Sequence, residues 1–185
     1  MLKPGQIITT FKTKKGRETV IRVVAKTDAQ KLMDFINPIF AEDTFLMRGP
    51  EDLVKNLKEQ QTYVNDQLKK LKKNEGVLLI AQYLDRIVGS VDLRRMVYRQ
   101  KHMGEIGITI SVDFREEGIG QKLMTAIIQE AGNLKLRSLY LHCLANNPRA
   151  IHVYEKMGFT KTGGLPKAYL YKGEYIDQVT MYLEF

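Results

Sequence analysis

The stretch from Gly104 to Leu134 constrains the fold more than any other part of the chain. It opens with strict alternation between apolar residues on one face and small or polar residues on the other, the pattern of a half-buried strand. The apolar positions are Ile106, Ile108, Ile110 and Val112. A glycine-bearing turn over residues 115–120 leads into an amphipathic helix with Leu123, Ile127, Ile128, Ala131 and Leu134 on one side. The pattern predicts a strand, a turn and a helix in direct succession.

The order of the other segments predicts the fold class. Strands are expected at residues 19–25, 77–84, 87–93, 104–112, 139–143 and 178–185, and helices from 27 or 28 to about 40, from 50 to about 73, after 120 and over 146–157. Antiparallel hairpins therefore precede a late βαβ crossover. This order predicts a mixed α/β fold with a largely antiparallel central sheet. Residues 1–18 are expected to be an N-terminal extension and residues 19–185 a single domain.

Composition excludes several classes of protein. Of 185 residues, 44% are hydrophobic and 27% charged, as is usual for a globular domain rather than a disordered or membrane-spanning chain. The first residues show no apolar secretory signal and Cys143 is the single cysteine, so we expect a cytoplasmic protein without a disulfide. The net charge of +8 favours anionic partners: nucleic acid, an anionic membrane or a phosphorylated small molecule.

Residues 110–120 join a strand to a helix N-terminus, where free N–H groups and the helix dipole favour a phosphate. A P-loop is excluded, because Gly120 is followed by Gln121 and Lys122 rather than by Lys and Ser or Thr. A dinucleotide fingerprint is excluded by Leu123 at its third glycine position. The remaining interpretations are an Arg-x-x-Gly-x-Gly anion loop and an ordinary glycine turn.

A second motif supports the first of these interpretations. Arg115–Gly120 resembles the pyrophosphate loop of the GNAT superfamily of acyl-CoA-dependent N-acyltransferases, and Asn147–Phe159 resembles that family's Asn-x-x-Ala-x-x-x-Tyr-x-x-x-Gly-Phe helix. The motifs lie in the family's order with one strand between them, and the resemblance extends from Thr19 to the C-terminus. It departs at Val112, where the family often has proline. The resemblance implies a GNAT fold, whose fourth and fifth strands splay apart.

The resemblance also implies an acetyl-CoA-dependent N-acetyltransferase, in which a primary amine attacks the acetyl group directly in a ternary complex. Backbone groups of Ile108, Thr109 and Ile110 would bind the pantetheine arm like an added strand, and the Ile110 N–H would face the thioester oxygen. The other expected cofactor-binding residues are Arg115, Glu116, Glu117, Gly118, Ile119, Gly120, Gln121, Lys122, Asn147 and Tyr154.

Two residues are the expected catalytic groups. The resemblance places the Tyr154 hydroxyl near the sulfur as general acid, against the alternative of a tyrosine that only packs on the core. Alternation places Glu105 on one face with Gly107 and Thr109, where it could act as general base. The alternative is a strand-end glutamate that pairs with a surface arginine. Asp92, on the neighbouring strand, is the reserve candidate for the base.

The acceptor is expected to be a small amine, an amino acid or a protein or peptide amine, bound by Phe45, Asp92, Tyr175 and Asp177. No metal, nucleic acid or membrane is expected, because the histidines lack metal-ligand spacing and the basic residues are scattered. A homodimer is possible in this family. Two other functions stay open: a nucleic-acid-binding or chromatin-associated basic module, and a CoA-binding homologue that does not turn over.

Overall fold

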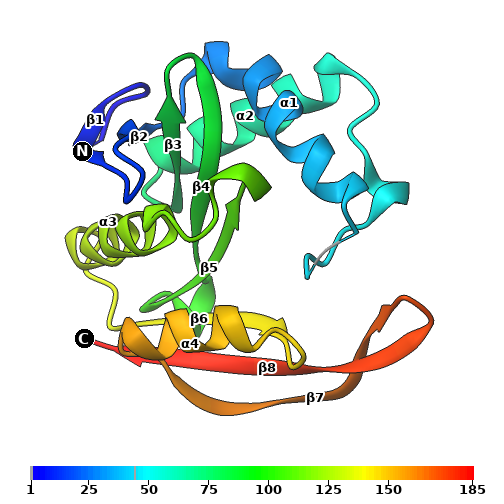
Figure 1. Cartoon of the computed structure of the whole chain (residues 1–185). Helices are drawn as coiled ribbons and strands as arrows, with labels where there is room; N and C mark the ends of the chain where they lie inside the picture. The colour runs from blue at the N-terminus through cyan, green and yellow to red at the C-terminus, as the bar shows by residue number, and fades with distance from the viewer. Residues whose placement is uncertain (1, 44) are drawn as a thin grey trace.

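The computed structural model describes residues 2–43 and 45–185, which form one eight-stranded sheet and four α-helices (Figure 1). The strands are β1 (Ile7–Lys12), β2 (Glu18–Val23), β3 (Gly76–Tyr83), β4 (Arg86–Arg95), β5 (Met103–Ile110), β6 (Ser138–Leu144), β7 (Thr160–Tyr171) and β8 (Glu174–Glu184). The helices are α1 (Ala29–Ala41), α2 (Leu57–Lys72), α3 (Ile119–Asn133) and α4 (Pro148–Lys156). The strand order is β1-β2-β3-β4-β5-β6-β8-β7, and every pair except β5–β6 is antiparallel. The predicted mixed, largely antiparallel α/β fold is confirmed.

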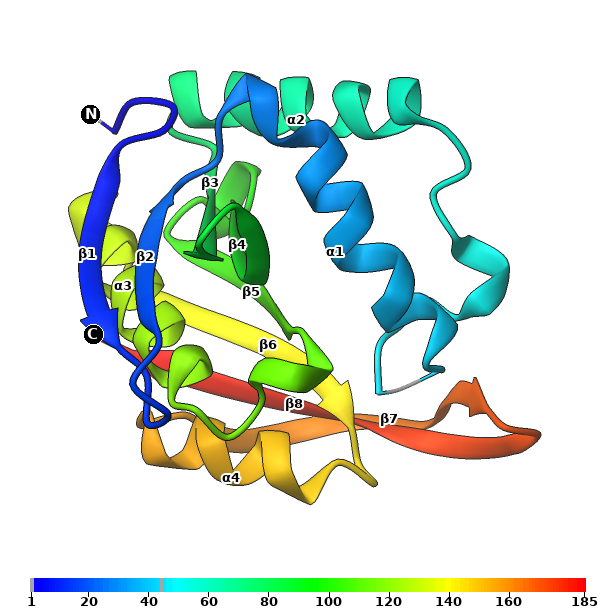
Figure 2. The same ribbon diagram turned by 45° about the horizontal axis from the view of Figure 1, so that its top comes forward.

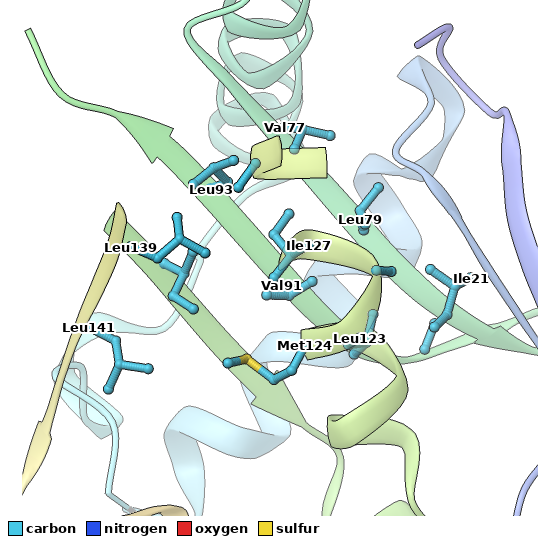
Figure 3. Packing of buried hydrophobic residues seen from close by; sticks show 14 of the residues in the cluster. Ile21, Val77, Leu79, Val91, Leu93, Leu123, Met124, Ile127, Leu139 and Leu141 are labelled. Carbon is cyan, nitrogen blue, oxygen red and sulfur yellow. The ribbon is translucent and has the colours of Figure 1, made fainter. Parts of the chain in front are cut away.

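Helices cover both faces of the sheet. On one face, Leu123, Met124 and Ile127 of α3 pack against apolar side chains of the central strands (Figure 3). On the other face, α1 and the buried Val64 of α2 pack against Leu78 of β3. Strand alternation explains this division, because neighbouring residues of β3 belong to different clusters.

The second helix begins later than predicted. The sequence indicated a helix from Pro50, but residues 50–52 form a single 3₁₀ turn and α2 starts at Leu57. Asn56 caps α2 by accepting a hydrogen bond from the Glu59 N–H, at 3.0 Å. The Asn37 side chain of α1 accepts a hydrogen bond from the Val54 N–H and donates one to the Val54 carbonyl. These bonds hold the segment between the 3₁₀ turn and α2 outside an α-helix.

Strands β5 and β6 separate partway along their length. Their pairing runs from Met103–Ser138 to Glu105–Tyr140 and ends there. Beyond that point the backbone of β5 pairs on its β4 side only, with the last partners being Gly89 and Ile110. The splay predicted for the family's fourth and fifth strands is therefore present. These are the fifth and sixth strands of this chain, because β1 lies within the segment expected to be an extension.

The N-terminal segment joins the same sheet. Strand β1 pairs with β2, and the two form a hairpin whose turn reaches the start of α3 (Figure 2). None of the helices that the structure describes is long and apolar enough to cross a membrane.

Candidate functional site

A cavity of about 1590 Å³ opens where β5 and β6 separate. It extends from the side chains of α1 and α2, past the floor formed by β4 and β5, to the loop that precedes α3 and the start of α4. Its volume exceeds the ~300–1,000 Å³ typical of a pocket for one small ligand. The cavity can therefore hold two substrates end to end.

One end of the cavity lies at the loop before α3, where the sequence predicts cofactor binding. Glu116 and Gly118 both adopt left-handed conformations, with φ of 67° and 87°, and α3 begins directly after them. No side chain among the described residues caps this helix, so its first N–H groups remain available for an anion. Gly120, in the first turn of α3, faces β5: a Cβ built on it would lie in ordinary van der Waals contact with the Ile110 side chain, at 3.9 Å.

The expected cofactor-binding residues divide into two groups. Those that line the cavity are Ile108, Thr109, Ile110, Arg115, Glu116, Gly118, Ile119, Gly120, Gln121, Asn147 and Tyr154. Glu117 and Lys122 do not line it. Glu117 is buried and its side chain faces the β1–β2 turn, and the Lys122 ammonium lies over the Phe11 ring of β1. These two side chains are therefore not brought to the cavity with the others.

Arg115 connects the two ends of the cavity. Its guanidinium bonds both carboxylate oxygens of Glu42, at the end of α1, at 3.0 and 2.9 Å. Its Nε donates to the Ile110 carbonyl at 3.3 Å. Bidentate pairing of this kind fixes orientation as well as charge. Arg115 therefore ties the phosphate loop to the helix that lines the acceptor end.

Tyr154 lies at the junction of the splay and α4. It lines the cavity with Cys143 of β6, and its ring packs against Phe159 at 6.3 Å between centroids. Burial, together with the nearby Cys143 thiol, raises the pKa of Tyr154. The hydroxyl is therefore protonated at neutral pH, as in an ordinary tyrosine, and is a weaker acid than one. Asn147 caps α4, since its Oδ1 accepts from the Ala150 N–H at 3.1 Å.

The acceptor end contains a carboxylate with a perturbed pKa. Burial, followed by the negative charge of Glu105, raises the pKa of Asp92 to about 6. Asp92 pairs in register with Gly107, where an added Cβ would lie 3.0 Å from the carboxylate oxygen, so the glycine makes room for the acid. Burial and the Asp92 charge also raise the pKa of Tyr63, from α2, to about 12. Both side chains line the cavity.

Glu105 lies outside the cavity that Asp92 lines. Its carboxylate pairs with Arg94, its cross-strand neighbour on β4, and accepts a hydrogen bond from the Tyr140 hydroxyl at 3.3 Å. It does not line the cavity. Glu105 therefore has the alternative arrangement, a glutamate at the start of a strand paired with a surface arginine, whereas Asp92 lines the cavity.

Of the four expected acceptor-binding residues, two line the cavity and two do not. Phe45 and Asp92 line the cavity, and Phe45 stacks on Tyr171 of β7 at 5.8 Å. Tyr175 is 66% exposed and outside the cavity. Asp177 is also outside, because its carboxylate accepts a hydrogen bond from the Lys167 N–H at 2.8 Å and so stabilises the irregular β7–β8 pairing. The structure therefore does not bring Tyr175 and Asp177 to the cavity with Phe45 and Asp92.

Sequence reasoning missed several polar residues that line the cavity, among them Lys14, Arg48 and Tyr63. Arg48 lies in a segment without regular pattern, and Lys14 lies in the segment expected to be an extension. Tyr63 directly precedes Val64, which belongs to the apolar stripe on α2, and this neighbouring position was the signal that the sequence offered. Within residues 2–43 and 45–185, no group of three His, Cys, Asp or Glu side chains is arranged to hold a metal ion.

Comparison with protein families gives a match to the Acetyltransferase (GNAT) family over residues 36–159. That range includes the splay, the loop before α3 and Tyr154, but neither β1 nor β2.

Two relatives are similar over part of their length. Spermidine N(1)-acetyltransferase of Vibrio cholerae is 30% identical over 98 residues, which are 52% of this chain and 56% of that protein. The L-amino acid N-acetyltransferase AaaT of Escherichia coli is 32% identical over 84 residues, or 45% of this chain and 52% of that protein. The chain therefore spans about half the length of the relatives it matches.

The solved structure of spermidine N-acetyltransferase from Vibrio cholerae, in complex with CoA and spermine, is similar at a TM-score of 0.74 and 22% identity. The similarity covers 90% of this chain and 95% of that one, and it shows a shared fold.

Proposed function

Because the chain belongs to the acetyltransferase (GNAT) family, we propose that it is an N-acetyltransferase that moves an acetyl group from acetyl-CoA to a primary amine. The observation that carries this proposal is one continuous cavity lined by the loop before α3, by the half-buried Asp92 and by Tyr154. Direct transfer between two bound substrates needs such a continuous space.

The cofactor end fits acetyl-CoA. The uncapped start of α3 and the left-handed loop before it offer N–H groups to a pyrophosphate. The unpaired edge of β5 over Ile108–Ile110 offers backbone groups to an extended arm. When bound, acetyl-CoA supplies an activated acetyl thioester. The structure of its CoA-bound relative supports the same assignment.

Asp92 is the proton acceptor in this proposal. A general base works best when its pKa lies near the working pH, and a pKa of about 6 leaves the Asp92 carboxylate ionised at neutral pH yet able to take up a proton from an ammonium. Tyr154 is the proposed proton donor because it lines the cavity at the splay and its hydroxyl is protonated. Its raised pKa makes it a weaker acid than a free tyrosine, so its assignment rests on position, whereas the Asp92 shift brings that pKa closer to neutral pH.

The acceptor is proposed to be a primary amine on a small molecule or peptide. The acceptor end carries three acids, Asp52, Glu59 and Asp92, which attract a cationic amine. Phe45 and Arg48 beside them offer an apolar contact and a counter-charge. Relatives named for spermidine and for L-amino acids both fall within this class.

The test is calorimetric titration with acetyl-CoA, followed by thiol-release assays with spermidine, L-amino acids and a short peptide with a free N-terminus. We expect acetyl-CoA to bind and at least one amine to release CoA. Binding without turnover of any amine would instead favour a non-catalytic CoA-binding homologue. Salt-dependent binding of a DNA duplex, with no acetyl-CoA binding, would favour the nucleic-acid module.

A further inference from the structure

The turn between β1 and β2 is fastened to the loop before α3, although the two are 104 residues apart in sequence (Figure 2). The Lys14 N–H donates to the Glu117 carbonyl at 3.1 Å, and the Thr13 hydroxyl donates to Glu117 Oε2 at 2.7 Å. The Arg17 guanidinium lies over the Phe114 ring at 4.3 Å. A backbone hydrogen bond, a side-chain hydrogen bond and a cation–π contact thus all hold the turn against this loop.

Glu117 is the centre of this contact. Its side chain is 1% exposed, and Oε1 lies 3.4 Å from both Lys15 Nζ and Arg17 Nη1. A buried carboxylate is costly unless cations or donors compensate its charge. Because the compensating groups come from the β1–β2 turn, the turn and the loop stabilise each other. The loop can then contain the acid Glu117 next to a phosphate site, because cations of the turn balance the charge of this carboxylate on the side away from the cavity.

The other charges of the loop are also balanced by residues outside it. Glu116 pairs with Arg149 of α4 at 3.2 Å, and Arg115 pairs with Glu42. Neither arginine is then a free cation for a phosphate.

Lys14 differs from these residues. It is exposed, forms no ion pair with any residue that the structure describes, and lines the cavity together with Gly118 and Gly120. The neighbouring Lys122 instead lies over Phe11 and outside the cavity. At the loop end of the cavity, the turn therefore contributes a lysine that has no ion-pair partner among the described residues.

We propose that Lys14 binds a phosphate group of the CoA donor and that Glu117 is a positioning residue for this site; the inference rests on the proposed function. A lysine ammonium is a flexible point charge that suits a phosphate oxygen. Lys14 approaches from the hairpin, while the N–H groups of α3 approach from the loop. The β1–β2 turn, which lies outside the matched family range, thus completes the proposed cofactor site.

Glu117 acts through the loop backbone. The residues on either side of it, Glu116 and Gly118, are both left-handed, and such conformations persist when surrounding contacts hold them. The contacts of Glu117 with Thr13 and Lys15 supply that restraint. They keep the loop in the shape that directs its N–H groups toward the cavity.

The first test measures CoA affinity of the full chain by calorimetry for Lys14→Ala and for a matched control, Lys12→Ala. Lys12 carries the same charge on the same hairpin but does not line the cavity. We expect Lys14→Ala to weaken CoA binding about tenfold, the size of one charge-assisted contact, and Lys12→Ala to leave it nearly unchanged. With 3′-dephospho-CoA, a deficit that persists assigns Lys14 to the pyrophosphate, and one that disappears assigns it to the 3′-phosphate.

Equal affinities for Lys14→Ala and the unchanged protein would overturn the inference while leaving the proposed function intact. The same is true if both lysine variants weaken equally, because that would be a general effect of charge. If the unchanged protein binds no CoA, the proposed function fails and the inference fails with it.

The second test compares Glu117→Gln with Glu18→Gln, an exposed acid of the same hairpin. We expect Glu117→Gln to lower both the melting temperature and the CoA affinity, with Glu18→Gln changing neither. A purely structural Glu117 would lower the melting temperature and leave the CoA affinity of the folded variant unchanged, which would overturn its positioning role. Lys14→Ala tests the site independently if Glu117→Gln does not fold.

Discussion

The two ends of the cavity are built differently. The proposed cofactor end comes largely from one contiguous stretch, the β5 edge and the loop before α3, to which the β1–β2 turn and the start of α4 add single side chains. The acceptor end is assembled from side chains of separate elements, including Phe45, Arg48, Tyr63 and Asp92. Backbone sites need glycine and a fixed conformation, whereas side-chain sites need particular chemical groups. The comparison predicts that changes at one end alter cofactor affinity, and changes at the other alter turnover.

Gly118→Glu is expected to have the largest effect. The substitution forces a glutamate into a left-handed conformation of φ 87° and adds bulk and negative charge at the phosphate loop. Acetyl-CoA binding should be lost in calorimetry. Gly132→Glu, on open space near the other end of α3, is the control and should bind normally. Retained tight binding by Gly118→Glu would mean that this loop does not hold the cofactor.

Asp92→Asn should lower the turnover rate by about 10²–10³-fold, the range for loss of a general base. Acetyl-CoA affinity should stay the same, because Asp92 lies at the acceptor end. Paired turnover and binding measurements on one preparation check both statements. A variant with near-normal turnover would remove Asp92 from the mechanism.

Tyr154→Phe should lower turnover by about 10²-fold through loss of the proton on the hydroxyl. The ring and its contact with Phe159 are kept, so the melting temperature and acetyl-CoA affinity should change little. If affinity falls as strongly as turnover, Tyr154 is a binding residue and belongs to the cofactor end.

Glu105→Gln should have the smallest effect. Its carboxylate pairs with the exposed side chain of Arg94, and such pairs contribute less than about 1 kcal/mol to the free energy of unfolding. Turnover should remain within a factor of about three, because a small loss of this kind does not alter the site. A drop comparable to that of Asp92→Asn would exchange the roles assigned to the two acids.

The difference between the two ends also explains what sequence could predict. The cofactor loop was predictable because its strand, glycines and helix are adjacent in the chain and their conformations are local. Asp92 and Glu105 were harder to separate, since alternation gives the face of a strand but not the position along the cavity. Cross-strand pairing distinguishes the two acids: Glu105 lies opposite Arg94, and Asp92 lies opposite Gly107, where space is available.

Long-range contacts account for the remaining errors. Asn37 holds the segment before α2 out of a helix, although Pro50 and two following acids are a normal helix start. The β1–β2 turn reaches the cofactor loop through Glu117, a contact across 104 residues that no local pattern indicates. Glu117 itself sits inside the predicted motif, and only the structure shows that it faces away from the cavity.

The most direct test of Asp92 as proton acceptor at the acceptor end is the pH dependence of turnover, using the amine that reacts fastest in the panel. Because Asp92 accepts a proton only when ionised and its pKa is raised to about 6, turnover should fall as the pH drops through about 6. Asp92→Asn should lose this acidic limb. Glu105→Gln should keep it, moved to lower pH, because the Glu105 charge contributes to the raised pKa. An acidic limb near pH 6 that persists in Asp92→Asn would contradict the account.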